Sequence, residues 1–125
     1  MIEFKENDME SKLPANVYLV EYENGAIAIW RHMSWERPHM IYTHGTGWVC
    51  VDGVHIGRYN LRNYEYVLDN YTHSGDIMAA FRDVKHISFA DFNAVLDSLR
   101  GVPHTTRAFR VDTTAELRAH ENKSQ

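Results

Sequence analysis

Two turn signals constrain the fold of this chain more than any other feature of its sequence. They are the pairs Asn24-Gly25 and Asp52-Gly53, each flanked by short apolar segments. A two-residue hairpin loop needs positive φ at both central positions, and these pairs tolerate that conformation. The flanks carry β-branched and aromatic residues, which pleated strands favour. The sequence therefore predicts two β-hairpins in its first half.

The first hairpin is predicted to pair residues 17–23 with residues 26–32. A two-residue loop would place Val20 opposite Ile29. Both faces of this hairpin carry apolar residues, which favours a central position in the sheet.

The second hairpin is predicted to pair residues 47–51 with residues 54–59. Side chains that lie directly opposite share one face of the sheet. One face would then hold only core residues, which are Val49, Val51, Val54 and Ile56. The other face would hold Trp48, Cys50, His55 and Tyr59, and this face is where a function could begin.

Between the hairpins, residues 33–39 are predicted to form a connecting loop that contains Trp35. Pro38 cannot donate to a strand ladder, and it disfavours helix at the residue before it. Residues 40–44 read as a short strand, which completes an antiparallel meander of about five strands.

The second half of the chain has helical periodicity. Residues 60–71 fit either a helix or a strand, and we favour the helix. Helices are also predicted at 74–85, at 88–100 with Ser88 as the cap and Gly101 as the stop, and marginally at 114–120. Residues 107–111 read as a last strand.

Strands followed by helices predict an α+β fold, with the C-terminal helices packed on one face of the antiparallel sheet. The sequence leaves open which face they cover. At 125 residues the chain fits a single domain, with a loose acidic arm at 1–16 and a frayed tail at about 119–125.

Charge and composition narrow the class of protein. The net charge is −4, but residues 24–62 hold two acids and four arginines, which gives +2. One cysteine fits a reducing compartment, the first residues lack the basic-then-apolar layout typical of a secretion signal, and no apolar run is long enough for a membrane span. We therefore expect a cytoplasmic protein that does not contact a membrane.

Cys50 and His55 are the one catalytic pair that the predicted register creates. An imidazole can take a thiol proton and leave a nucleophilic thiolate. The pair also needs an orienting acid or amide and an oxyanion site, and the sequence supplies neither. A small enzyme that uses Cys50 and His55 is therefore an alternative interpretation.

Eight histidines raise the question of a metal site. His39 and His44 are five residues apart, so on one continuous strand they would point to opposite faces. The sequence has no HExxH motif and no CxxC pair. We expect no metal and no cofactor, although the sequence leaves open whether the histidines converge.

Tryptophan, tyrosine and arginine gather in the mildly basic middle of the chain, and these residues are enriched at protein-interface hot spots. The candidate partner-binding residues are Trp35, Arg37, Trp48, Arg58 and Tyr59. The leading interpretation is a small non-enzymatic module that binds another protein, such as an immunity protein or a phage-encoded antagonist of host defence. A single-stranded nucleic-acid binder that uses the same basic aromatic region is a second alternative. Self-association is left open.

Overall fold

The computed structural model describes residues 15–31, 36–71 and 75–111 of the chain. Its strands are β1 (Val17–Tyr22), β2 (Ile27–Trp30), β3 (Met40–Thr43), β4 (Gly47–Val51), β5 (Lys85–Ile87) and β6 (His104–Phe109). Its helices are α2 (Arg58–Tyr71), α3 (Gly75–Ala80) and α4 (Phe89–Ser98). None of these helices is long and apolar enough to cross a membrane.

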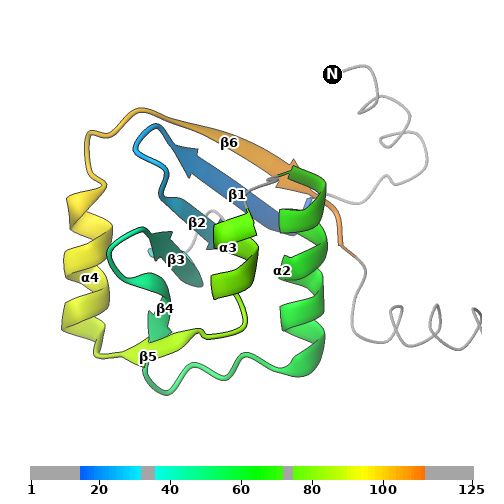
Figure 1. The fold of residues 1–125 in the computed structure, drawn as a ribbon, viewed down its shortest axis with the longest axis horizontal. Coiled ribbons are helices and arrows are strands. Elements are labelled where there is room, and N and C mark those ends of the chain that lie inside the picture. The colour runs from blue at the N-terminus through cyan, green and yellow to red at the C-terminus, as the bar shows by residue number, and fades with distance from the viewer. Residues whose placement is uncertain (1–14, 32–35, 72–74, 112–125) are drawn as a thin grey trace, which may run out of the picture.

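The six strands form one sheet in the order β5-β4-β3-β2-β1-β6 (Figure 1). The pairs from β4 through β3 and β2 to β1 and β6 are antiparallel, and only β4 and β5 run parallel. The predicted α+β class and the mostly antiparallel sheet are therefore confirmed. The parallel pair arises because α2 and α3 form the crossover between β4 and β5, which a parallel connection requires.

The first predicted hairpin forms, but its register differs by one residue. The loop holds three residues, because the Tyr22 N–H donates to the Ala26 carbonyl, 2.9 Å away. Gly25 has φ +92°, and the Asn24 side-chain oxygen accepts from the Ala26 N–H at 3.0 Å. This is the three-residue alternative to the tighter turn. Leu19 therefore lies opposite Ile29, in place of the predicted Val20.

The second predicted hairpin is wrong. The Asp52-Gly53 turn does form, with a bond of 3.0 Å from the Val54 N–H to the Val51 carbonyl. Residues 54–57 then leave the sheet, and α2 begins at Arg58. The free edge of β4 pairs instead with β5, which lies within and just after the helix predicted at 74–85. A tertiary pairing thus replaces the local one.

The helices follow the predicted periodicity more closely. The favoured helix at 60–71 is confirmed as α2, whereas the helix predicted from residue 74 is shorter than expected. The Ser88 hydroxyl accepts from the Asp91 N–H at 3.0 Å, which caps α4 as predicted. Gly101 has φ +86° beyond its end. The last strand forms as β6, three residues earlier than predicted. The arm before residue 15, the helix at 114–120 and the tail lie outside the described residues.

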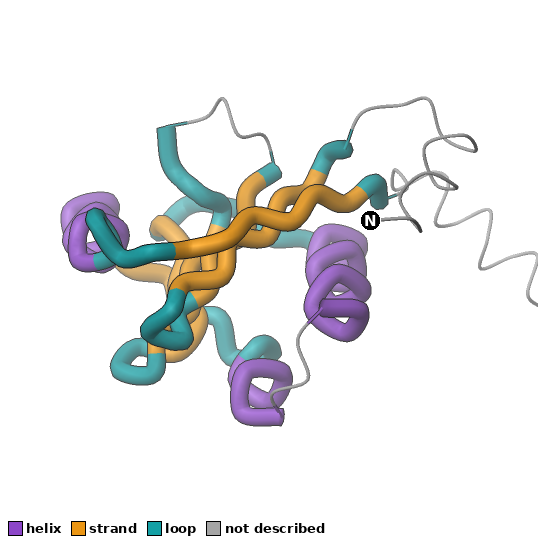
Figure 2. The backbone as a smooth tube through the Cα atoms, turned by 90° about the horizontal axis from the view of Figure 1, so that it is seen from above, coloured by secondary structure: helices purple, strands orange, loops and turns teal. Residues whose placement is uncertain are grey.

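The helices cover both faces of the sheet, so the prediction that they pack on one face is wrong. Figure 2 shows α4 on one side of the strands and α2 and α3 on the other. Two hydrophobic cores result. The α2/α3 core is built on Leu19, Ile27, Ile29, Met40, Trp48, Cys50, Tyr64, Leu68 and Phe81, among others. The α4 core is smaller and holds Val20, Ala26, Ala28, Ile41, Val49, Phe92 and Leu99.

Candidate protein-binding surface

Cys50 lies beside a different histidine from the one that the sequence suggested. It is fully buried in the α2/α3 core, and β5 places His86 opposite it. The Cys50 Sγ is 3.3 Å from His86 Nδ1. His55 is exposed in the segment after the turn, and it has no strand register with Cys50. The predicted Cys50–His55 cross-strand pair is therefore wrong, because residues 54–57 are not a strand.

The Cys50 thiol is held in its protonated form. Burial raises its pKa, and the nearby Asp52 carboxylate raises the pKa further. A thiol in this state is a weak nucleophile, so the contact with His86 is a packing contact with a weak hydrogen bond. Within the ranges that the structure describes, no three His, Cys, Asp or Glu side chains are close enough to share a metal ion.

A partly buried polar cluster joins the first half of α2 to the loop before β3. His39 Nδ1 is hydrogen-bonded to the Tyr64 hydroxyl, and the two rings meet edge to face. Burial and the nearby Arg31 lower the pKa of His39 to about 4. Burial raises the pKa of Tyr64 to about 12, against the opposing effect of Arg31. Arg31 also donates to the Asn60 side chain at 3.1 Å.

This cluster closes the end of the α2/α3 core. Tyr64 is 0% exposed, so its hydroxyl faces His39 and not solvent. A neutral imidazole and a neutral phenol satisfy one another there, as buried polar groups must. Sequence reasoning missed the pair, because the two residues are 25 positions apart. No periodicity links a loop histidine to a helix tyrosine.

The five predicted partner-binding residues do not form one surface. Trp48 is 0% exposed, and its indole N–H donates to the Ile77 carbonyl at 3.1 Å, so this ring is a core group. Arg37 lies at the start of α4, whereas Arg58 is exposed at the start of α2 on the other side of the sheet. Trp35 and the side chain of Tyr59 lie outside the described part of the chain.

Arg37 belongs to a surface that runs along α4. Phe89 is 51% exposed, which is unusual for a large apolar ring, and the Arg37 guanidinium lies 4.7 Å from its centroid. Asn93, Leu96 and Arg100 follow Phe89 at three- or four-residue steps, so they continue along the same side of the helix. At 1.5 Å per residue, Phe89 and Arg100 are roughly 16 Å apart.

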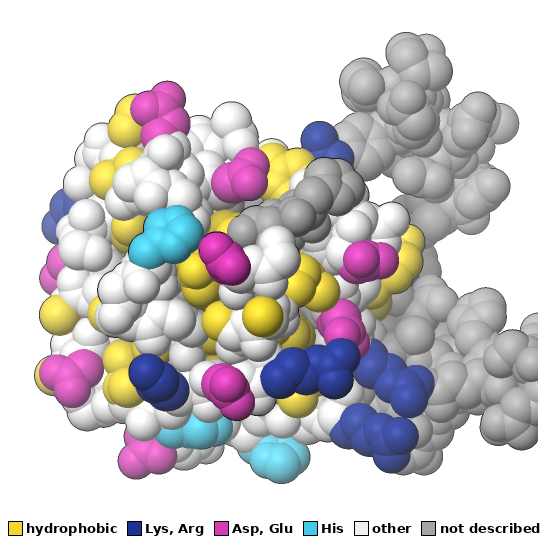
Figure 3. Space-filling model, in the orientation of Figure 1, with side chains coloured by type: hydrophobic (Ala, Val, Ile, Leu, Met, Phe, Trp, Pro, Cys, Tyr) yellow, Lys and Arg dark blue, Asp and Glu magenta, His cyan; other side chains and the backbone are white. Residues whose placement is uncertain are grey.

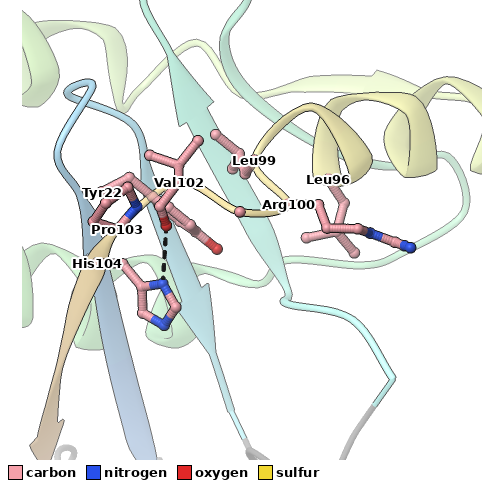
Figure 4. Close-up of a pocket in the computed structure, with 8 residues that line it drawn as sticks. Tyr22, Leu96, Leu99, Arg100, Val102, Pro103 and His104 are labelled. Carbon is pink, nitrogen blue, oxygen red and sulfur yellow. Dashed lines mark hydrogen bonds between the residues drawn. The ribbon is translucent and has the colours of Figure 1, made fainter.

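A hollow of about 610 Å³ lies at the far end of this stripe. It is lined by Tyr22, Leu96, Leu99, Arg100, Gly101, Val102, Pro103 and His104. Figure 4 shows Leu96 and Arg100 at its α4 end, with the Arg100 guanidinium pointing away from the other lining residues, and Tyr22, Pro103 and His104 on the β1 and β6 side. Positive φ at Gly101 lets the chain turn from the helix towards β6 and so forms the wall.

The hollow is mostly apolar with a polar rim. The Tyr22 and His104 rings lie 5.3 Å apart, and burial raises the pKa of Tyr22. The Arg100 guanidinium is 2.8 Å from the Asp97 carboxylate, and both side chains are well exposed. We refer to Arg37, Phe89, Asn93, Leu96, Arg100 and this hollow together as the α4 surface.

Compared with known proteins, the chain matches no family model, no curated protein and no solved structure. What the α4 surface does must therefore follow from its own side chains.

Proposed function

We propose that this protein is a small binding module whose α4 surface contacts another protein. The observation that carries the proposal is the exposed Phe89 ring beneath Arg37, in line with Leu96 and the hollow. An aromatic ring with an arginine beside it is the combination that dominates measured binding hot spots. Such a ring loses its contact with water when a partner covers it.

The size and composition of the surface support a protein partner. A stripe roughly 16 Å long fits about three turns of a partner helix, or about five residues of a strand. The hollow can accept one apolar anchor side chain from the partner. The half-buried Arg37 at one end and the exposed Arg100 at the other supply a charged rim that orients the contact.

The mode of action that we propose is inhibition by occupancy, as in an immunity protein or a phage-encoded antagonist of host defence. Such a protein needs a rigid scaffold and one binding surface, and it needs no catalytic group. The protonated state of Cys50 gives the thiol-enzyme alternative no support. One cysteine in the chain is compatible with a cytoplasmic site of action.

The test begins with affinity purification from the native host, followed by titration calorimetry with each purified candidate partner. Changing Arg37→Ala together with Phe89→Ala should weaken binding by at least about 30-fold, since a hot spot is worth about 2 kcal/mol or more. The fold should remain, because half of the Phe89 ring is exposed already.

Arg107→Ala is the matched control. Arg107 also lies over an aromatic ring, 4.3 Å from the Tyr71 centroid, but on the α2 side of the sheet. Like Arg37→Ala, the Arg107→Ala change removes one positive charge and one contact between a guanidinium and an aromatic ring. If the double variant binds every partner as tightly as the control does, the α4 surface is not the interface. A dimer in light scattering that only the double variant abolishes would make a second copy the partner.

A further inference from the structure

The outer face of α2 carries a second stripe of a different chemistry, which is exposed at Arg58 and Tyr66 and half-buried at Arg62. Arg58, Arg62 and Tyr66 follow one another at four-residue steps, so they lie along one side of the helix. Tyr66 is 55% exposed, and Arg58 is exposed at the first residue. Figure 3 shows Lys and Arg side chains gathered where Figure 1 places the start of α2.

Arg82 extends this stripe from the segment after α3. Its side chain is 73% exposed and forms an ion pair with Glu65 of α2, which fixes it beside the helix. Glu65 and Asp69 are the acidic side chains of α2 on this side. The charge is therefore concentrated near the start of the helix, and it weakens towards Asp69.

The placement of these arginines opposes the local preference of a helix. The first turn of α2 holds no acidic residue, and Arg58 lies at the positive end of the helix dipole. A cation there destabilises the helix. A residue that costs stability at its own position is often retained for binding.

We propose that this stripe binds single-stranded nucleic acid. The arginines neutralise backbone phosphates, and Tyr66 offers a ring on which a base stacks. A protein partner fits this face less well, because the side chains around Tyr66 are charged or amide groups and supply no apolar anchor. The inference does not rest on the α4 surface, which lies across the sheet.

The probe is a fluorescent single-stranded oligonucleotide, measured by anisotropy at increasing salt. Phosphate contacts from Arg58, Arg62 and Arg82, the last in exchange for its Glu65 partner, predict a log–log salt slope of about −2. This slope is roughly a hundredfold loss of affinity from about 20 to about 200 mM salt. Arg58→Gln with Arg62→Gln should weaken binding and reduce the slope to about −0.7. Tyr66→Ala should cost about tenfold, and Tyr66→Trp should restore binding.

Arg107→Gln with Arg110→Gln is the control, because it removes two charges near the far end of α2, roughly 20 Å away. Equal loss in both double variants would reduce the effect to net charge and overturn the site. The absence of salt-dependent binding would overturn it too, as would equal affinity for polyglutamate, which would indicate an acidic protein. None of these outcomes affects the Arg37/Phe89 test.

Discussion

The two faces of the sheet are covered in different ways. The α2/α3 face is packed with aromatic rings, and three polar pairs lie on it, which are Trp48–Ile77, His39–Tyr64 and Cys50–His86. The Asn63 Oδ1 of α2 is buried without a hydrogen-bond partner. The α4 face is covered by a helix of ten residues over mostly aliphatic side chains. We call the first the closed face. The second, which leaves Phe89 51% exposed and Leu96 partly exposed, we call the thin face.

This difference changes which side chains are candidates for function. On the closed face, side chains that could take part in chemistry, such as the Cys50 thiol and the Tyr64 phenol, are buried and pack in the core. The Phe89 ring, by contrast, is 51% exposed to solvent on the thin face. Contacts with a protein partner are therefore expected on the thin face, and not at the reactive groups buried on the closed face.

The largest expected effect is on the closed face. Trp48→Ala removes a fully buried ring and leaves the Ile77 carbonyl without its donor, so it should cost about 3–5 kcal/mol of unfolding free energy. Leu96→Ala on the thin face should cost only about 1–2 kcal/mol, because Leu96 is half-buried. Urea unfolding of both variants measures the contrast, and similar losses would contradict the comparison.

The next effect is a dependence of stability on pH. His39 has a pKa of about 4 in the folded protein, below its unfolded value of about 6.5, so the unfolded chain binds more protons between these values. Stability is therefore full above about pH 6.5 and falls towards pH 4. We expect a loss of about 1–2 kcal/mol, reduced from the full shift because the ring is partly solvated.

Two variants separate the closed face from the thin face in this measurement. His39→Gln keeps a hydrogen-bonding group for Tyr64 but cannot titrate, so the acid loss should shrink. His104→Gln, on the α4 side, keeps the His39 contact and should retain the acid loss. An unchanged pH profile in His39→Gln would show that another group causes it.

A smaller effect is expected at the start of α4. Ser88→Ala removes the hydroxyl that accepts from the Asp91 N–H, which should cost about 1 kcal/mol. Because α4 carries the proposed partner-binding side chains, the same variant should also raise hydrogen exchange in that helix. Equal protection in α4 before and after the change would mean that packing alone holds the helix.

The smallest expected effect is at Cys50. Its buried thiol with a raised pKa should react slowly with a thiol reagent at pH 8 in the native protein, and fast after unfolding. The rate against pH gives the test. Rapid native labelling with an apparent pKa below the reference of about 8.5 would restore the activated-thiol hypothesis.

Local signals in the sequence determined the elements that depend on neighbouring residues. The turn at Asn24-Gly25 and the cap of α4 at Ser88 could each be predicted, because backbone sterics and short-range hydrogen bonds set them. The period of α2 fitted both a helix and a strand, and only the favoured helix proved correct. Even so, the loop length at Gly25 was one residue off, since two- and three-residue turns share the same glycine signal.

Only the tertiary structure decided which partners these elements meet. β5 takes the edge of β4 that the Asp52-Gly53 signal assigned to residues 54–59, so His86 replaces His55 beside Cys50. The same sheet separates Arg37 from Arg58. Both belong to the arginine- and aromatic-rich middle of the sequence, but they lie on opposite sides of the sheet. Strand pairing between segments that are distant in the sequence depends on burial summed over many residues, so local periodicity cannot predict it. The sequence therefore determined local geometry, and burial on two unequal faces decided which side chains remain available to a partner.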